Sequence, residues 1–401
     1  MAGKKLIQPG LAVVAACSLA FSVGTFTVRA TSGKMLPANV SQVCSKPAAA
    51  HKMQCLALSR TDAQGGGSSP LGLHPADLQS AYNLPSQASG EGATVAVIDA
   101  YDDPTAEKDL TTYRNTFGLP LCATAGGCLR KVNQRGESTN LPSPNSHWAG
   151  ETSLDLDMVS ATCPKCKLLL VEADSDDDAE MLASVNTAVK LGAKFISNSY
   201  GDNEPANAAA FDQQYLNHPG VTITVSSGDS GFGASYPATS SYVTAVGGTT
   251  LNRANRLPRK WSESAWSDSG SGCSDSLPKT LWQPATVACA QRAESDVSAV
   301  ADPETGVSVY DSYLSDGWKI DGGTSVSAPI IAGVYALAGT PGPQDYPSLY
   351  PYAHPTAFND ITTGSNGSCP IAVLCNAGLG WDGPTGLGTP NGIAGFQAPK
   401  A

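Results

Sequence analysis

A glycine pair precedes a serine near the carboxyl end of this chain, within the segment Asp321–Pro329. Ser325 follows this pair and a threonine, and the apolar stretch Ala328–Ala338 predicts a buried helix with Ser325 at its N-terminus. Glycines allow a tight turn and close approach of a substrate. Free N–H groups and the positive end of the helix dipole favour a developing oxyanion. The segment therefore predicts a nucleophilic serine, and a serine that only caps a buried helix is the alternative.

A serine nucleophile needs a general base, and no histidine of this chain fits that role. The string Gly323-Thr324-Ser325-Val326-Ser327-Ala328-Pro329 resembles the nucleophile segment of the subtilisin clan of serine peptidases. That resemblance implies a base in a His-Gly pair at the start of a helix. Each histidine of the chain precedes Lys, Trp or Pro instead, at positions His51, His74, His147, His218 and His354. The base must be another residue, or the chain is an inactive relative.

Two carboxylates offer the alternative base. Glu151 and Asp155 are spaced i, i+4, so on a helix they share one face and can hydrogen-bond if they share a proton. The surrounding segment is largely apolar, which predicts a helix buried on most sides. Two carboxylates in such a place are costly unless they are paired or protonated. A solvated acidic face is the ordinary alternative, and the apolar setting argues against it.

Together with Ser325, this acidic pair resembles the triad of the sedolisin family, the serine-carboxyl peptidases. The likeness runs from Leu71 to about Phe396, and its further landmarks lie in order along the chain at Leu71–Tyr82, Ser197–Gly201, Ser226–Gly231, Asp296–Ala299 and Ala301–Gly306. The resemblance implies that Ser325 is the nucleophile, that Glu151 is the general base and acid, and that Asp155 orients Glu151. It also implies that backbone around Ser199, Tyr200 and Gly201 lines the cleft and pairs with a peptide substrate as an added strand.

Asp229 follows the apolar strand Val221–Val225 and lies in a glycine-rich turn. Subtilisin relatives carry an oxyanion-hole asparagine there, and the sedolisin resemblance gives that role to Asp229. A carboxylate would repel an oxyanion, whereas a neutral carboxylic acid can donate a hydrogen bond to it. Asp229 must then be protonated, and we expect activity in acid solution. An aspartate that only caps a turn is the alternative.

Asp99 closes the strand Ala93–Ile98, where a typical sedolisin carries an accessory glutamate. We expect Asp99 to hydrogen-bond Asp155 and to help orient the acidic pair, as supporting carboxylates do elsewhere. The shorter side chain departs from the family pattern. An acidic residue at a strand end beside an acidic turn is an equally weighted alternative.

A calcium site is expected near the carboxyl end. The spacing of Asp360-Ile361 and Gly378-Leu379-Gly380-Trp381-Asp382 resembles the calcium loop of the sedolisins, in which two aspartates supply carboxylates and Ile361, Gly378 and Gly380 supply backbone carbonyls. Oxygen ligands from a glycine-rich loop suit a hard cation. We expect one structural Ca²⁺ that strong acid releases, because its carboxylate ligands must be ionised. Without the family resemblance, an ordinary turn would be the better interpretation.

The composition suits an acidic extracellular protein. The formal net charge is -11 and charged residues are only 15% of the chain, which makes nucleic acid an unsuitable partner. Residues 1–30 have a basic start, an interrupted apolar run and a small residue at Ala30, and predict a cleaved secretory signal without stable membrane insertion. A lipid anchor at Cys17 is a minor alternative. A monomer is expected.

Ten further cysteines fall as close neighbours, which predicts five local disulfides. The pairs are Cys44 with Cys55, Cys122 with Cys128, Cys163 with Cys166, Cys273 with Cys289, and Cys369 with Cys375. The Cys163-Pro164-Lys165-Cys166 segment could be a redox motif, but it lacks a thioredoxin-like context. Zinc is disfavoured because no second close pair of ligands accompanies it.

Short apolar strands alternate with helical stretches between Ala93 and Leu251. The predicted strands are Ala93–Ile98, Lys167–Val171, Lys194–Asn198, Val221–Ser226 and Tyr242–Val246, and the predicted helices are Pro104–Phe117, His147–Thr162, Ala179–Leu191 and Ala206–Asn217. This alternation predicts an α/β fold, a subtilisin-like parallel sheet with helices on both faces and the site at the carboxyl ends of the strands. We expect Asn252–Tyr313 to form surface loops near the nucleophile.

We therefore expect three parts: the signal at 1–30, an arm with one disulfide and a Gly/Ser linker at 31–70, and a single peptidase domain at 71–401. Sedolisins carry a large folded prosegment, and forty residues are too few to form one, so we expect a variant that lacks it. The leading hypothesis is a secreted acid endopeptidase acting on polypeptides. A catalytically silent peptide-binding relative is the alternative, and a neutral-pH hydrolase is disfavoured by the missing histidine.

Overall fold

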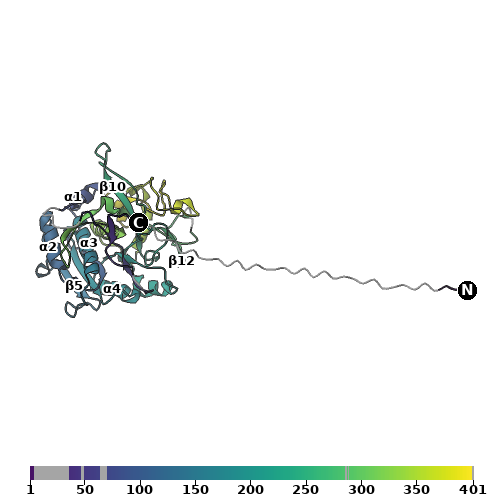
Figure 1. The fold of residues 1–401 in the computed structure, drawn as a ribbon, viewed down its shortest axis with the longest axis horizontal. Coiled ribbons are helices and arrows are strands. Elements are labelled where there is room, and N and C mark those ends of the chain that lie inside the picture. The colour runs from purple at the N-terminus through teal and green to yellow at the C-terminus, as the bar shows by residue number, and fades with distance from the viewer. Residues whose placement is uncertain (4–35, 47–48, 64–69, 285–286, 288, 400–401) are drawn as a thin grey trace. The chain divides into compact units, whose positions relative to one another are not determined.

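The computed structural model describes residues 1–3, 36–46, 49–63, 70–284, 287 and 289–399. The expected signal peptide beyond residue 3, Cys17, and residues 64–69 of the Gly/Ser linker lie outside the described residues. From Met35 to Ala401 the chain forms one unit, and Figure 1 labels some of its helices and strands.

This unit contains many short strands and fewer helices. The strands are β1 (Val40–Gln42), β2 (Gln54–Cys55), β3 (Leu58–Arg60), β4 (Thr94–Ala100), β5 (Leu129–Asn133), β6 (Lys167–Ala173), β7 (Phe195–Asn198), β8 (Tyr200–Gly201), β9 (Thr222–Ser226), β10 (Thr244–Arg253), β11 (Trp261–Ala265), β12 (Gly272–Pro278), β13 (Gln291–Glu294), β14 (Val297–Val300), β15 (Val307–Asp311), β16 (Gly317–Gly322), β17 (Phe358–Asn359) and β18 (Thr389–Pro390). The α-helices are α1 (Pro75–Ala81), α2 (Ala106–Thr116), α3 (Ser146–Thr162), α4 (Asp178–Lys190), α5 (Ala208–Phe211), α6 (Thr324–Ala338) and α7 (Tyr350–Ala353).

The central sheet has the strand order β11-β10-β9-β7-β4-β6-β5, and β14 also pairs with β10. The strands from β10 to β5 pair in parallel, and only β11 runs antiparallel to its neighbour. The predicted parallel sheet is confirmed. Strand β5 was not predicted, because it lies at the edge of the sheet and carries Arg130 and Lys131 where a buried strand would be apolar.

Helices cover both faces of the sheet, as predicted. Alternate residues of a strand point to opposite faces, and those of β4 divide between two apolar clusters. Val95 and Val97 pack in the cluster that contains residues of α3 and α6. Ala96 and Ile98 pack in the other cluster, with residues of α4. Every side chain of β4 after its first residue is therefore buried, which explains the apolar run Val95–Ile98 that precedes Asp99.

The expectation that Asn252–Tyr313 forms surface loops is wrong. This stretch contains the end of β10 and the five strands β11 to β15. Val297–Val300 is fully buried and pairs in parallel with β10. Small residues let other parts of this stretch approach neighbouring backbone: a Cβ at Gly270 would lie 1.9 Å from the carbonyl oxygen of Ser227. Short strands of small residues lack the long apolar run on which the prediction depended.

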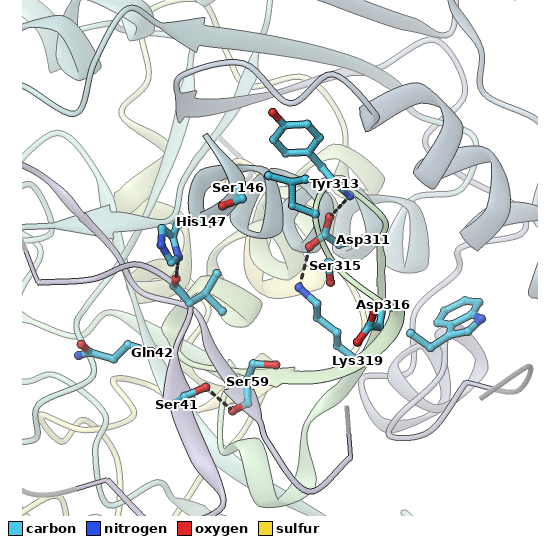
Figure 2. Close-up of a pocket in the computed structure, with 13 residues that line it drawn as sticks. Ser41, Gln42, Ser59, Ser146, His147, Asp311, Tyr313, Ser315, Asp316 and Lys319 are labelled. Carbon is cyan, nitrogen blue, oxygen red and sulfur yellow. Dashed lines mark hydrogen bonds and ion pairs between the residues drawn. The ribbon is translucent and has the colours of Figure 1, made fainter. Parts of the chain in front are cut away.

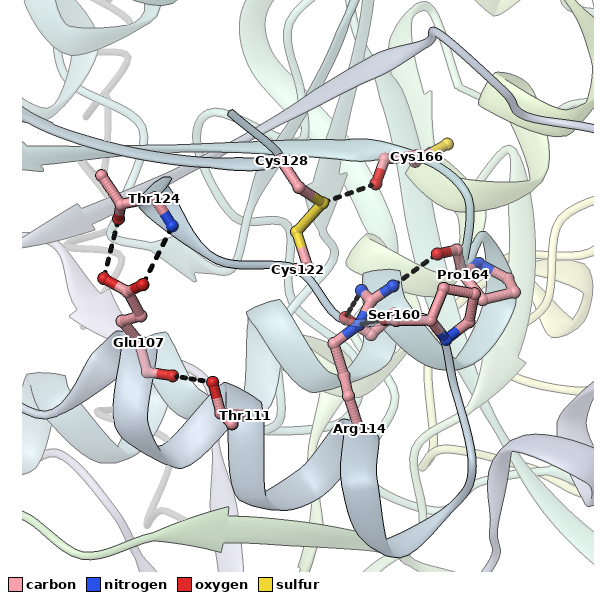
Figure 3. The surroundings of a disulfide bond; sticks show 10 residues. Glu107, Thr111, Arg114, Cys122, Thr124, Cys128, Ser160, Pro164 and Cys166 are labelled. Atoms are coloured by element: carbon pink, nitrogen blue, oxygen red, sulfur yellow. Dashed lines mark hydrogen bonds between the residues drawn. A yellow bond between two sulfur atoms is a disulfide. The ribbon is translucent and has the colours of Figure 1, made fainter. Parts of the chain in front are cut away.

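All five predicted disulfides are formed. Figure 3 shows the Cys122–Cys128 bridge near the helix α2, whose Glu107 accepts hydrogen bonds from the amide and hydroxyl of Thr124 at 2.9 and 2.8 Å. In the same helix the buried guanidinium of Arg114 donates to the hydroxyl of Ser160 at 2.8 Å. The bond between Arg114 and Ser160 attaches α2 to α3, the helix that carries the acidic pair.

Candidate active site

Helix α6 begins at Thr324, so Ser325 lies in its first turn as predicted. Gly323 precedes the helix with φ of 89°, a conformation that glycine adopts without the strain of a side chain. Two hydroxyls of β9 fix the start of the helix: Ser226 donates to the carbonyl of Thr324 at 2.8 Å, and Thr224 donates to the carbonyl of Ala328 at 3.0 Å. The sheet therefore positions the nucleophile through the helix backbone.

Pro329 lies inside α6 and has no N–H to offer the carbonyl of Ser325, four residues before it. That carbonyl instead accepts a hydrogen bond from the hydroxyl of Ser199 at 3.4 Å. In return, the hydroxyl of Ser325 donates to the carbonyl of Ser199 at 3.1 Å. Ser199, directly after β7, is thus a second contact point for the nucleophile.

Glu151 and Asp155 both lie on α3 and are both fully buried. The helix is buried from Trp148 to Thr162, because α1, α2, α6, β4 and β15 pack around it. The contact with α6 is close: a Cβ at Gly333 would lie 2.1 Å from the hydroxyl oxygen of Thr162. Asp155 accepts a hydrogen bond from the Ser199 hydroxyl at 2.7 Å. Within the described part of the chain, neither carboxyl oxygen of Glu151 has a hydrogen-bond partner.

Electrostatics join these two groups to Asp99, which is also fully buried. Burial raises the pKa of Glu151 well above its usual range, and the neighbouring Asp155 and Asp99 raise it further. The Ser325 hydroxyl acts in the opposite direction and lowers it. Burial, followed by Asp99, likewise raises the pKa of Asp155. Burial raises the pKa of Asp99 to about 8. Three carboxyl groups so placed cannot all ionise in neutral solution, so the cluster holds protons.

The expected hydrogen bond between Asp99 and Asp155 stays a prediction. Both oxygens of Asp99 and the Oδ2 atom of Asp155 are buried and accept no hydrogen bond from the described residues. A bond between two carboxyl groups requires that one of them carries a proton. The raised pKa values of both groups favour that protonated state.

Asp229 follows β9 and lies beside the start of α6. Its Oδ1 atom accepts hydrogen bonds from the amide and the hydroxyl of Thr324, both at 2.8 Å. Its Oδ2 atom is buried and has no partner among the described residues. Burial raises the pKa of Asp229 to about 7, although the two bonds from Thr324 lower it. A protonated Asp229 could therefore donate from Oδ2 while Thr324 holds Oδ1.

The chain's own N-terminal arm crosses this site. The amide of Ser325 donates to the carbonyl of Leu56 at 3.3 Å, and the amide of Leu56 donates to the carbonyl of Ser199 at 3.1 Å. Beside these contacts, β2 pairs antiparallel with β8 at Tyr200 and Gly201. The segment 199–201, which was expected to pair with a substrate strand, thus pairs with residues 54–56 of the same chain.

Leu56, Thr324 and the hydroxyl of Ser199 were not predicted from the sequence. Thr324 stands directly before the nucleophile, so its position was a usable signal. The arm gave no signal beyond its cysteines, because contacts of Leu56 with residues 199 and 325 depend on the tertiary fold.

The five residues of the expected calcium site lie around one loop. Asp382 accepts a hydrogen bond from the amide of Gly378 at 3.0 Å, and Asp360 accepts one from the amide of Gly380 at 3.0 Å. Asp382 is fully buried, and its pKa is raised to about 7, first by burial and also by Asp360. The two carboxyl groups form no ion pair with a basic side chain in the described residues.

This donor set fits a hard cation. The carbonyl oxygens of Ile361, Gly378 and Gly380 accept no hydrogen bond from any described residue, so they are free to act as ligands. No group of three or more His, Cys, Asp or Glu side chains gathers to hold a metal in the described residues. The expected site has only two such side chains and takes its other ligands from the backbone.

Comparison with known proteins places this geometry in a family. The model of the subtilase family matches residues 122–351, more than half of the chain. Kumamolisin from Bacillus sp. (strain MN-32) is 32% identical over 378 residues, which cover 84% of this chain and 65% of that protein. Tripeptidyl-peptidase 1 from Rattus norvegicus is 26% identical over 428 residues, which cover 92% of this chain and 72% of that protein.

Among solved structures, a Pseudomonas sedolisin, a serine-carboxyl proteinase complexed with two molecules of pseudo-iodotyrostatin, superposes with a TM-score of 0.67. It is 25% identical, and the match covers 81% of this chain and 96% of that one. The chain matches the subtilase family model and belongs to the sedolisin family. It spans 65% of the length of kumamolisin.

Proposed function

We propose that this protein is a serine-carboxyl endopeptidase that hydrolyses polypeptides through an acyl-enzyme on Ser325. The observation that carries the proposal is the position of one peptide carbonyl. The oxygen of Leu56 accepts a hydrogen bond from the amide of Ser325 and lies by the bare Cα of Gly323, as does the unpaired oxygen of Asp229. A substrate carbonyl in this position would be ready for attack and for stabilisation of the oxyanion.

In the proposed reaction, Ser325 attacks the carbonyl carbon while Glu151 takes the hydroxyl proton and later gives it to the leaving amine. The Ser325 hydroxyl must first turn from the carbonyl of Ser199 to Glu151. Ser199 and Asp99 support Asp155, which holds Glu151 in place. A neutral Asp229 donates to the oxyanion. Loss of such a donor typically costs about 3 kcal/mol.

The proposal of endopeptidase action is supported by the path of the arm. The chain continues on the amino side of Leu56 through Cys55 and Gln54 to Met53, whose amide donates to the carbonyl of Asp176 at 2.8 Å. The cleft therefore accommodates a fourth residue before the carbonyl. An enzyme that released only tripeptides would need this side of the cleft to be closed after three residues.

Three further parts of the proposal concern the working pH, the location of the protein and a bound metal ion. Acid solution keeps Asp229 neutral, so we propose an acid optimum. Five disulfides suit an oxidising compartment and support secretion. In the described part of the chain, no helix combines the length and apolar character needed to cross a bilayer. One Ca²⁺ held by Asp360, Asp382 and the loop carbonyls would stabilise the loop without taking part in the reaction.

Incubation of the purified protein and its Ser325→Ala variant with a denatured protein, from about pH 3 to about pH 8, tests the proposal. We expect internal cleavage in acid by the parent only. Equal fragmentation by both proteins, or a maximum at neutral pH, would refute it. Release of tripeptides alone would refute the endopeptidase assignment and leave the chemistry standing.

A further inference from the structure

The N-terminal arm passes the catalytic serine as an extended strand with partners on both sides. On the amino side of the Leu56–Ala57 bond, β2 pairs antiparallel with β8. On the carboxyl side, β3 pairs antiparallel with β16, directly before the glycine that precedes α6. A peptide that binds across a protease cleft uses main-chain pairing in this way. The Leu56–Ala57 bond therefore lies where the cleft crosses Ser325.

The carbonyl group of this bond points at the groups that would stabilise an oxyanion. Its oxygen is 3.3 Å from the amide nitrogen of Ser325. A Cβ at Gly323 would lie 2.0 Å from the same oxygen and 2.6 Å from Oδ2 of Asp229. Both oxygens therefore lie over the bare face of Gly323, and the Asp229 oxygen has no hydrogen-bond partner among the described residues.

A disulfide braces the bond from its amino side. Cys55, the residue before Leu56, is joined to Cys44. Next to this bridge, the amide of Val43 donates to the carbonyl of Ala57 at 2.9 Å, and β1 pairs antiparallel with β3. The segment before the Leu56–Ala57 bond is thus held to the segment after it by main-chain hydrogen bonds of residues 40–43, and the disulfide joins those residues to Cys55. Both segments also pair with the cleft.

Further contacts hold the arm on the enzyme surface. Lys52 pairs with Asp176 at 2.8 Å and with Asp177 at 3.1 Å. Figure 2 shows the other side, where a cavity of about 320 Å³ separates part of the arm from the β15–β16 connection. There a ring nitrogen of His147 lies 2.6 Å from the carbonyl of Val43. A carbonyl only accepts, so the Nδ1 atom of His147 carries the proton.

We propose that this braced arm is a built-in inhibitor whose reactive bond is Leu56–Ala57, so that the chain is its own first substrate. The inference rests on the proposed peptidase function. A free peptide leaves the cleft after it is cut, because nothing holds its two halves. In this chain both new ends stay paired to the enzyme and to each other, so the cut arm still covers Ser325.

The cleavage follows the proposed chemistry. The Oγ atom of Ser325 bonds to the carbonyl carbon of Leu56, and its proton passes to Glu151. The bond from that carbon to the nitrogen of Ala57 breaks, and Glu151 returns the proton to this nitrogen. Water then attacks the acyl-enzyme, which gives a carboxyl group on Leu56 and frees Ser325. The Ala57 amine, held nearby, competes with water and can restore the peptide bond.

The test compares the full-length parent with a Cys44→Ser/Cys55→Ser variant, which lacks the brace. A Cys122→Ser/Cys128→Ser variant controls for the loss of another local disulfide, one outside the arm. We expect the unbraced variant to cleave an added peptide at about pH 4 at least tenfold faster than the parent and the control. Intact mass spectrometry under denaturing, non-reducing conditions should show its first cut after Leu56. No disulfide of the chain spans that bond, since Cys44 and Cys55 both precede it and the other four bridges follow it, so the two pieces separate under denaturing conditions.

A binding experiment keeps the inference distinct from the peptidase proposal. In the Ser325→Ala background no acyl-enzyme can form, and fluorescence anisotropy measures the affinity for a labelled peptide. We expect about tenfold tighter binding when the brace is removed, and also when Leu56→Asp weakens the arm with the disulfide intact. Thermal unfolding identifies variants that fail to fold.

Three outcomes would overturn the inference. The first is equal affinity and equal rate in braced and unbraced proteins, while the parent cleaves added peptide; this leaves the peptidase proposal intact. The second is a first cut elsewhere in the unbraced variant. The third is no cleavage of added peptide by any variant, including those with tighter binding, which rejects the peptidase function together with self-cleavage.

Discussion

Two pairs of acidic residues in this molecule each bring two carboxyl groups close together, and they relieve the like-charge repulsion in different ways. Glu151 and Asp155 lie inside a buried helix, and Asp360 and Asp382 lie on a loop. Neither pair has a basic partner among the described residues. Both oxygens of Glu151 also lack a hydrogen-bond donor, whereas Asp360 and Asp382 accept bonds from loop amides. The helix pair can avoid like-charge repulsion only by holding a proton, while the loop pair can share a cation.

Because of this difference, acid should act in opposite ways on the two pairs. One shared proton suits the helix pair, because burial and mutual repulsion disfavour two ionised carboxyl groups, while the other carboxyl group stays ionised so that Glu151 can take the proton of Ser325. Protonation harms the loop pair, because a calcium ligand must be ionised. Acid should therefore favour the reaction centre and weaken the loop. Four predictions test this contrast, in order of decreasing effect.

The largest effect is expected from Glu151→Gln, which keeps the shape of the side chain but cannot accept a proton from Ser325. We expect peptide hydrolysis in acid to fall by about 10³-fold or more, near the upper range for loss of a general base. Initial rates with a chromogenic peptide measure the loss. The free energy of unfolding in neutral solution should not fall, because a buried charge is removed. Retention of more than a tenth of the activity would exclude Glu151 as the base.

A second prediction separates the proposed role of Asp229 as a hydrogen-bond donor from its role as an acceptor of bonds from Thr324. Asp229→Ala removes the donor and should lower kcat/KM in acid by about 10²- to 10³-fold. Asp229→Asn keeps a donor at every pH while its oxygen can still accept from Thr324. We expect parental activity to fall as the pH rises through about 7, where Asp229 ionises, and the fall to shift to higher pH in Asp229→Asn. Identical pH profiles for the parent and Asp229→Asn would show that Asp229 does not act as an acid donor.

The core of the site could be predicted from sequence because each part depends on a local rule. Helical spacing places Glu151 and Asp155 on one face, strand ends place Asp99 and Asp229 at one edge of the sheet, and the resemblance to the sedolisins implies their roles. The remaining contacts join distant segments. The hydroxyl of Ser199 donates to Asp155, which lies 44 residues away in the chain. The carbonyl of Leu56 accepts a hydrogen bond from the amide of Ser325, which is far from Leu56 in the sequence. No periodicity or motif encodes such contacts.

The fold shows the same division. Buried strands with unbroken apolar runs, such as β4 and β6, were found within a few residues of their bounds. The strands β12 to β15 were missed, because they are short and polar residues interrupt each of them. Close packing near these strands depends on small residues, as the approach of Gly270, just before β12, to the backbone of Ser227 illustrates.

The third prediction concerns the loop pair. A chelator at about pH 6 should lower the melting temperature of the parent by several degrees, because a bound ion stabilises only the folded state. Added Ca²⁺ should restore it. Asp382→Asn should abolish the response, whereas Asp275→Asn, a change at an exposed carboxylate, should leave it intact. Metal analysis should find one calcium per parent chain. Absence of calcium from the native protein would remove the proposed site.

The fourth and smallest effect is the pH dependence of stability. Buried carboxyl groups away from the loop have raised folded-state pKa values, about 7 for Asp103 and about 8 for Glu172, chiefly through burial. Their unfolded values are near 4. Between these limits the folded state binds more protons, so stability is full below about pH 4 and falls as the pH rises toward 7 to 8.

Each shifted unit corresponds to about 1.4 kcal/mol. Urea unfolding in steps from about pH 4 to about pH 8, with saturating calcium throughout, should show this decline. Saturating calcium keeps the opposing response of the loop out of the measurement. A free energy of unfolding that rises over the same range would contradict the account of the buried acids.

The central claim is that a carboxylate, not an imidazole, activates Ser325. Its most direct test is the rate of Ser325 acylation by a peptide ester in the unbraced variant, followed by rapid quenching and intact mass spectrometry from about pH 3 to about pH 8. The account predicts fast acylation in acid, a decline as the pH passes about 7, and loss of acylation in Glu151→Gln. Acylation that rises toward neutral pH, or that survives Glu151→Gln, would contradict it.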